Sequence, residues 1–402
     1  MKELIQKPEL LYIAALFALF VVPKILQRFR LPSAITCVML GAGAGMGLSL
    51  FHNDPTIGLL STFGIVALFL FAGLEIDFAE LKSRLPTVAA YIGANLAGLA
   101  LAGWVAMLAF DLPLRPALLV ALAVLTPSAG FILNSLSSFG MTPNEGRWAR
   151  TMVVANEIVA LAVLFGILQS ASLPRFSISL GVLVLMIALL PLLFKAFARL
   201  VLPYAPNSEF AFLVMTAVLC AFVTRELGVY YLVGAFVAGI AAQRFRTELA
   251  SIASEQMLHA VEVFASFFVP FYFFHAGLHL ERSDFLPASF AVGLTIFAIM
   301  APLRVLWVAG LMRIVVAEPL KGGLRVGAAL LPTLVFTLVI AGILRDVYEV
   351  PGYVFGGLIV YTLVNTLLPG FILHAPRGAY GLPLEVELAE SEAATTSKSD
   401  LT

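Results

Sequence analysis

Residues 151–168 read TMVVANEIVALAVLFGIL, an apolar stretch of membrane-spanning length that contains a single carboxylate, Glu157. A second stretch, IFAIMAPLRVLWVAGLM at residues 296–312, contains a single guanidinium, Arg304. A charge at the centre of a bilayer costs about 2.5–3.5 kcal/mol on insertion scales. Two opposite charges inside such segments therefore indicate a pathway for an ion or a proton.

The composition places the whole chain in a membrane. Of its 402 residues, 61% are hydrophobic and 12% are charged, and the mean hydropathy is +1.01. A water-soluble chain of this length needs more charged surface than that. The net charge is zero, so nothing points to nucleic acid. The two cysteines, Cys37 and Cys220, lie in apolar stretches, where we expect small hydrophobic side chains rather than a disulfide.

Apolar segments of about 20 residues, the length that spans a bilayer, recur along the chain. We expect about thirteen spans with mostly short connections, forming one all-α polytopic bundle. Their expected ranges are 9–28, 32–51, 56–76, 86–110, 114–138, 147–170, 176–201, 208–227, 229–244, 263–280, 286–312, 322–345 and 351–374. With the N-terminus outside, 16 Lys and Arg residues fall on the cytoplasmic side and 7 outside. The sequence therefore predicts a cell-membrane protein whose C-terminus is cytoplasmic.

The chain divides into two parts by composition. Residues 1–376 form the transmembrane domain, and residues 377–402 are polar and acidic. We expect the second part to be a disordered cytoplasmic tail, too short for a regulatory domain.

Two of the expected spans contain a break. One holds Thr126-Pro127-Ser128-Ala129-Gly130, and the other holds Leu331-Pro332-Thr333. Proline removes a backbone donor, and non-helical backbone at membrane depth is tolerated only against protein or a water-filled cavity. A single Thr-Pro kink is more often structural. Breaks at corresponding positions in two halves, with Glu157 one span after the first and Arg304 one span before the second, instead favour a transporter site.

Two further motifs are assigned structural roles. Gly41-Ala-Gly43-Ala-Gly45-Met-Gly47 lacks a preceding strand and the spacing of a dinucleotide-binding fingerprint, and overlapping Gly-xxx-Gly pairs predict close helix packing. His275 and His279 lie four residues apart on one helical face, a spacing that could bind a metal. Because no third ligand is evident, we favour a packing or interfacial role for this pair.

Three segments resemble recurrent motifs of the Kef-type branch of the monovalent cation:proton antiporters. They are FLFAGLEIDFAELK at 69–82, YYLVGAFVAGI at 230–240 and FFVPFYFFHAGLHL at 267–280. The order of features also matches, and the similarity covers nearly all of residues 8–375. The resemblance implies the antiporter fold, with inverted repeats, two crossed discontinuous helices, a core domain and a dimerisation domain. It implies a homodimeric secondary transporter without a cofactor, not an enzyme. Because residues 377–402 are few, we expect no fused nucleotide-binding domain.

The resemblance also assigns site residues by position. Asn156 and Glu157 fall where the family has an Asn-Asp, Asp-Asp or Gln-Asp pair, and Arg304 falls where many members have Lys. The residues in or beside the unwound segments are Thr126, Pro127, Ser128, Pro332 and Thr333. The implied site for the transported cation or proton consists of Glu157, Asn156, Thr126 and Ser128, with Arg304 as charge partner. Glu in place of Asp and Arg in place of Lys are departures from the common pattern.

These residues predict alternating access in which Na⁺ or K⁺ and H⁺ compete for Glu157. Asn156 cannot titrate and Arg304 stays protonated, so one titrating group remains and we expect electroneutral 1:1 exchange. Arg304 has an alternative role, which is to compensate the partial negative charge of half-helix C-termini.

Other functions stay open. One is an ion-coupled solute symporter. Another is a channel, which is less favoured because the spans hold few polar groups. The last is a transport-inactive sensor or assembly factor, which fits the departures at Glu157 and Arg304.

Overall fold

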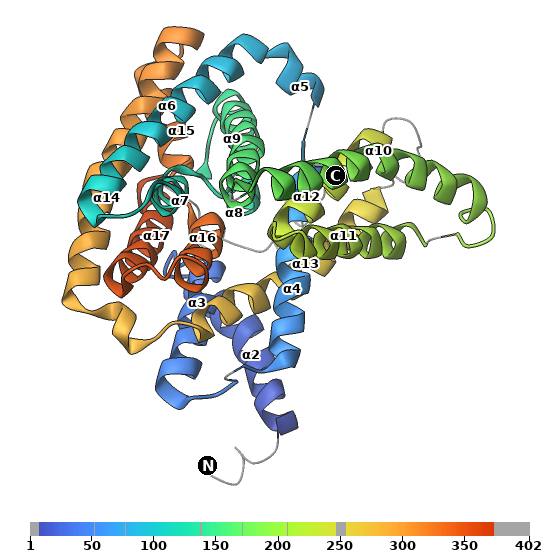
Figure 1. Cartoon of the computed structure of the whole chain (residues 1–402), viewed down its shortest axis with the longest axis horizontal. Coiled ribbons are helices and arrows are strands. Elements are labelled where there is room, and N and C mark those ends of the chain that lie inside the picture. The colour runs from blue at the N-terminus through green and yellow to red at the C-terminus, as the bar shows by residue number, and fades with distance from the viewer. Residues whose placement is uncertain are drawn as a thin grey trace, which may run out of the picture.

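A computed structural model describes residues 8–51, 53–76, 78–136, 139–170, 172–206, 208–246 and 255–373. This part of the chain contains helices and no strand (Figure 1). The longer helices are α2 (Pro8–Gln27), α3 (Ser33–Ala42), α4 (Pro55–Leu74), α6 (Leu85–Phe110), α7 (Leu114–Leu125), α9 (Pro143–Gln169), α10 (Leu173–Leu200), α11 (Glu209–Glu226), α12 (Tyr231–Arg246), α13 (Glu255–Leu278), α14 (Pro287–Leu311), α15 (Leu320–Ala329), α16 (Leu334–Asp346) and α17 (Gly352–Ile372). The shorter ones are η1 (Gly43–Gly47), α5 (Phe78–Ser83), α8 (Ala129–Ser135), η3 (Arg282–Phe285) and η4 (Met312–Val316). The all-α prediction is confirmed, and the predicted tail at 377–402 lies outside the described residues.

By length and composition alone, fewer helices qualify as candidate membrane spans than the thirteen ranges expected from the sequence. Among the described residues, nine helices are long and apolar enough to cross a bilayer, or ten if the bent pair α15–α16 counts as one span. The segments Ser33–Gly47 and Tyr231–Gln243 are apolar but shorter. Each of the expected ranges overlaps a helix or a helix pair, but the count of about thirteen is not confirmed.

The helices form two groups (Figure 1). In one group, α14 packs against α15 and α17, and α7 packs against α6 and α16. In the other, α4 packs against α12 and α13, and α13 also packs against α3. Helix α9, which carries Glu157, packs against α6, α7 and α15 and so belongs to the first group. The candidate site is therefore built there.

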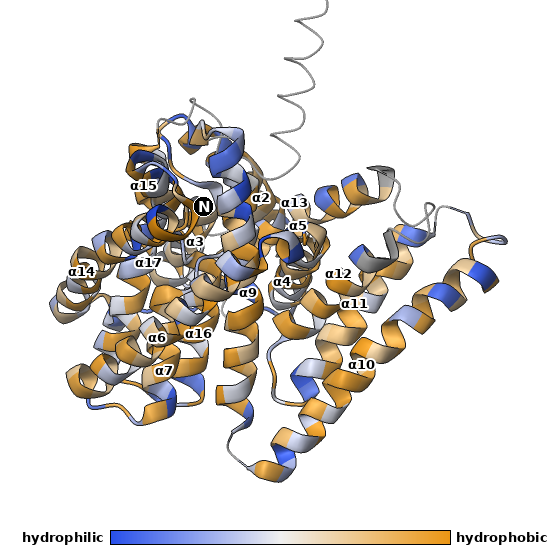
Figure 2. Ribbon diagram, turned by 90° about the horizontal axis from the view of Figure 1, so that it is seen from above, coloured by the Kyte–Doolittle hydropathy of each residue, from blue (hydrophilic) through white to orange (hydrophobic). Residues whose placement is uncertain are grey.

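The sides of helix α10 are mostly exposed. Only 11% of its most apolar window is buried inside the protein. Figure 2 shows hydrophobic residues along its length and hydrophilic residues near both ends. This pattern is typical of a helix whose sides face hydrocarbon and whose ends face water.

The glycine run packs α3 and η1 against α13, as predicted. A Cβ atom at Gly41 would overlap the Phe274 carbonyl oxygen of α13, whereas one at Gly43 would meet nothing within 4 Å. Gly45 and Gly47 repeat this alternation. The backbones therefore approach closely at every second glycine of the run, which no side chain would permit.

The two predicted breaks are present. Helix α7 ends at Leu125, and the backbone is extended at Thr126 and Ser128 before α8 begins. Helix α15 ends at Ala329, and α16 begins at Leu334 with a bend of 46° between them. The prolines in each break remove the amide hydrogens that would continue the helix.

Candidate cation site

The two breaks meet at Ser128. Its backbone amide donates to the Pro332 carbonyl oxygen at 2.8 Å, and its hydroxyl oxygen accepts from the Val335 amide at 2.9 Å. Ser128 is 1% exposed. Ser128 of the first break therefore supplies the hydrogen-bond partners of two backbone groups in the second break, the Pro332 carbonyl and the Val335 amide. Such groups need a partner where backbone is not helical inside a membrane protein.

The last carbonyls of α7 are satisfied from the other broken helix and from α17. The Thr337 hydroxyl of α16 donates to the Ala123 carbonyl at 2.8 Å. The Tyr361 hydroxyl of α17 donates to the Val124 carbonyl at 2.8 Å. These hydrogen bonds replace the ones that the Pro127 break removes, so the open turn is stable inside the bundle.

Glu157 lies beside the first break. It projects from the middle of α9, is 2% exposed, and accepts a hydrogen bond from the Ala129 amide at 3.1 Å. Among the described residues this carboxylate has no cationic partner in the structure. The structure thus brings Glu157 next to the segment that holds Ser128, as the sequence predicts.

Thr126 and Asn156 lie together on a small cavity of about 20 Å³ between α6, α7 and α9. Asn95 of α6 lines the same cavity, and its buried amide nitrogen has no hydrogen-bond partner among the described residues. This volume is about enough for one water molecule. Sequence reasoning missed Asn95, although an amide inside the apolar range 86–110 was a usable signal.

Arg304 of α14 binds the end of α15. Its guanidinium donates to the Leu330 carbonyl at 2.8 Å, the Leu331 carbonyl at 3.0 Å and the Tyr361 hydroxyl at 3.1 Å. In the described part of the chain it forms no ion pair with Glu157. The geometry corresponds to compensation of half-helix carbonyls, and an electrostatic effect on Glu157 stays a prediction.

Helix α17 supplies residues that the sequence did not reveal. Tyr361 and Asn365 are fully buried. The Asn365 amide donates to the Leu331 carbonyl and, at 3.3 Å, to the Tyr361 hydroxyl. The hydroxyls of Thr333 and Thr362 lie 3.0 Å apart in a hydrogen bond. Tyr361 therefore connects the open ends of both broken helices, directly at Val124 and through Arg304 at Leu330 and Leu331.

These features define a class of protein. Two broken helices cross inside an apolar bundle, and a buried carboxylate without a cationic partner in the described residues lies beside them. This is the architecture of a secondary transporter, in which discontinuous helices build the ion site at the bilayer midplane.

Comparisons with known proteins agree with this class. The chain is 22% identical over 385 residues to the probable Na(+)/H(+) antiporter 3 of Methanocaldococcus jannaschii, covering 89% of this chain and 93% of that protein. It is 23% identical over 265 residues to the probable Na(+)/H(+) antiporter GerT of Bacillus cereus, covering 63% and 68% of the two chains. Its fold is similar to that of the sodium proton antiporter MjNhaP1 from Methanocaldococcus jannaschii at pH 8, with a TM-score of 0.62, 16% identity and 95% of each chain covered.

Residues 13–376 match the family described as sodium/hydrogen exchanger, transmembrane. The chain belongs to this family, and it is a multi-pass membrane transporter rather than an enzyme.

Proposed function

We propose that this protein exchanges a monovalent cation, Na⁺ or K⁺, for H⁺ by alternating access, and that the two ions compete for Glu157. The observation that carries the proposal is the buried Glu157 carboxylate, which has one amide hydrogen bond and no cationic partner in the described residues. A buried carboxylate is strongly disfavoured as a free charge. A bound cation or a proton neutralises it, and each displaces the other.

Candidate oxygen ligands lie on the two elements that meet at this carboxylate, which are α9 and the break at Thr126–Ser128. Asn156 is its neighbour in the chain, and Thr126 shares a cavity with Asn156. The hydroxyl oxygen of Ser128 accepts one hydrogen bond and keeps a second lone pair. Hard monovalent cations prefer carboxylate, carbonyl and hydroxyl oxygens, which are the groups present here.

The stoichiometry follows from the groups that can release a proton. Asn156 has none to release, and the Arg304 guanidinium stays protonated at any physiological pH. Glu157 is then the single titrating group of the site. We infer a 1:1 exchange that moves no net charge.

The experiment uses purified protein in proteoliposomes that contain a pH-sensitive dye. Addition of Na⁺, K⁺ or Li⁺ drives proton flux through the wild type. Glu157→Gln abolishes this flux, and Glu226→Gln, at an exposed position of α11, leaves it unchanged. Full-speed exchange by Glu157→Gln contradicts the proposal, and a silent wild type supports the transport-inactive alternative.

The same liposomes test the stoichiometry and separate antiport from symport. An imposed membrane potential leaves a 1:1 exchange rate unchanged, because no net charge crosses. A rate that follows the potential contradicts 1:1 exchange. Cation entry accompanied by proton entry indicates a symporter instead.

The remaining assignments rest on the family resemblance and on the charge distribution. We infer a homodimer in the cell membrane, with the N-terminus outside and residues 377–402 as a cytoplasmic tail. Mass measurement in nanodiscs tests the dimer, and the side at which a protease removes the tail tests the orientation.

A further inference from the structure

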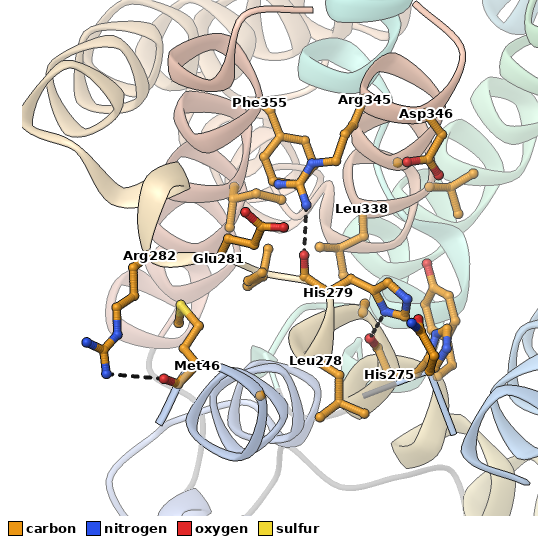
Figure 3. A pocket seen from close by; sticks show the side chains of 18 of the residues that line it. Met46, His275, Leu278, His279, Glu281, Arg282, Leu338, Arg345, Asp346 and Phe355 are labelled. Carbon is orange, nitrogen blue, oxygen red and sulfur yellow. Dashed lines mark hydrogen bonds between the residues drawn. The ribbon is translucent and has the colours of Figure 1, made fainter. Parts of the chain in front are cut away.

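A large cavity lies away from Glu157, where α13, α16, α17 and η1 come together (Figure 3). Its volume is about 680 Å³, and its lining includes His275 of α13 and His279, which directly follows the end of that helix. At Tyr272 the lining approaches the crossing of the broken helices, because the Tyr272 hydroxyl lies 3.5 Å from the Val335 carbonyl oxygen. The cavity therefore ends beside the first turn of α16, next to the crossing of the broken helices.

The two imidazoles are arranged as a pair at this cavity. Their ring centroids are 4.4 Å apart, and the ring planes are inclined by 56°. The His279 Nδ1 atom lies 2.9 Å from the His275 carbonyl oxygen (Figure 3). A carbonyl accepts a hydrogen bond, so we assign the proton of His279 to Nδ1, which leaves the lone pair of Nε2 free. Histidines that bind metals usually have this arrangement, with the other ring nitrogen donating to a carbonyl.

Both imidazoles border the cavity. The His275 Nε2 atom also lies near α4, 3.9 Å from the position that a Cβ atom would take at Gly58. His279 is exposed and His275 is half-buried. Two histidines four apart on one helical face can share a zinc ion at about 2.0–2.1 Å from each nitrogen.

The cavity lining carries equal numbers of acidic and basic side chains. Four charged side chains line the cavity: Glu281, Arg282, Arg345 and Asp346. Arg345 is paired with Asp284 at 2.5 Å and also donates to the His279 carbonyl oxygen at 2.7 Å, and Arg282 donates to the Met46 carbonyl at 3.2 Å (Figure 3). Two carboxylates and two engaged guanidinium groups leave the cavity close to neutral.

We propose that His275 and His279 form a site for a divalent transition-metal ion such as Zn²⁺, and that the bound ion obstructs the cavity. Neutral imidazole suits Zn²⁺ and Cu²⁺, whereas Na⁺ and K⁺ prefer oxygen, so this site differs in chemistry from the transport site. The described residues hold no cluster of three or more His, Cys, Asp or Glu side chains around an ion position. Water completes the coordination, and the ion exchanges readily with solution.

Binding is tested first without any transport. Protein carrying an affinity tag free of histidine is titrated with ZnCl₂ in nanodiscs by calorimetry. We expect one saturable Zn²⁺ per chain, with affinity lowered about tenfold or more in His275→Gln and in His279→Gln. His259→Gln, on the same helix, is the matched control and keeps wild-type affinity. No saturable binding in the wild type, or undiminished affinity in the double Gln variant, overturns the proposal.

The consequence for transport rests on the proposed exchange function and is measured separately. Zn²⁺ on the cavity side of proteoliposomes slows cation-driven proton flux in the wild type but not in the double Gln variant. If the protein binds Zn²⁺ and transports nothing, the exchange proposal fails while the metal site stands. If Zn²⁺ binds at the pair and flux is unaffected, obstruction of the cavity is wrong. Thermal unfolding confirms that each variant is folded.

Discussion

Ser128 and Val335 join the two broken helices through a hydrogen bond of 2.9 Å from the Val335 amide to the Ser128 hydroxyl oxygen. The acceptor lies in the first break and the donor in the first turn of α16, more than two hundred residues later in the chain. This contact makes the two breaks parts of one structure, so the position of each depends on the other.

Loss of that hydroxyl leaves a buried amide unsatisfied. We expect Ser128→Ala to lower the free energy of unfolding by about 1–3 kcal/mol, the usual cost of an unsatisfied buried donor. Ser177→Ala removes an exposed hydroxyl that bonds within its own helix, and we expect a change of about 0.5 kcal/mol or less. Denaturation in detergent measures both, and equal effects would show that the crossing contact contributes nothing.

The Tyr361 hydroxyl makes three hydrogen bonds. It donates to the Val124 carbonyl and accepts from the Arg304 guanidinium and the Asn365 amide. Tyr361→Phe keeps the ring and removes these contacts, so we expect a loss of about 1–3 kcal/mol in stability. The matched control is Tyr353→Phe on the same helix, whose ring packs against Phe110. Slower exchange by Tyr361→Phe at a temperature where the variant is folded would assign the hydroxyl a positioning role as well. A Tyr361→Phe protein as stable as the control contradicts the network.

The two roles of Arg304 give different outcomes on substitution. Its three hydrogen bonds go to Leu330, Leu331 and Tyr361, so we expect Arg304→Gln to lower stability by about 2 kcal/mol or more. Arg304→Lys keeps the charge but not the forked geometry, and its loss should be smaller. Thermal unfolding gives the order of the variants. A fully stable Arg304→Gln protein with a displaced pH profile of exchange would instead identify Arg304 as the electrostatic partner of Glu157.

Much of the architecture could be predicted because its causes are local. The free-energy cost of a charge in lipid singled out Glu157 and Arg304, and proline chemistry located both breaks. The span count was less predictable. Hydropathy does not show that the apolar segment at α3 is a short helix, or that α15 and α16 are two helices with a bend between them.

The partners of the site were not predictable in this way. Tyr361 and Asn365 matter because of which carbonyls the breaks leave open, and that depends on how α17 packs against them. The sequence also left two roles open for Arg304, as a charge partner of Glu157 or as a donor to half-helix carbonyls. Its expected depth in the membrane does not show which groups accept its hydrogen bonds. A packing or interfacial role was expected for the His275–His279 pair, and its place on a cavity is a result of tertiary structure.

The glycine run offers a test in which neighbouring glycines give opposite results. A Cβ atom at Gly41 would overlap the Phe274 carbonyl oxygen of α13, and backbone cannot move aside as a flexible side chain can. We expect Gly41→Ala to separate α3 from α13 and to cost about 1–3 kcal/mol, the range for overpacking. Gly43 has open space, and alanine favours helix by about 1 kcal/mol over glycine, so Gly43→Ala should be neutral or stabilising. Unfolding of both variants in the same detergent measures the difference. Equal stability would mean that the close approach of these helices is not a feature of the protein in solution.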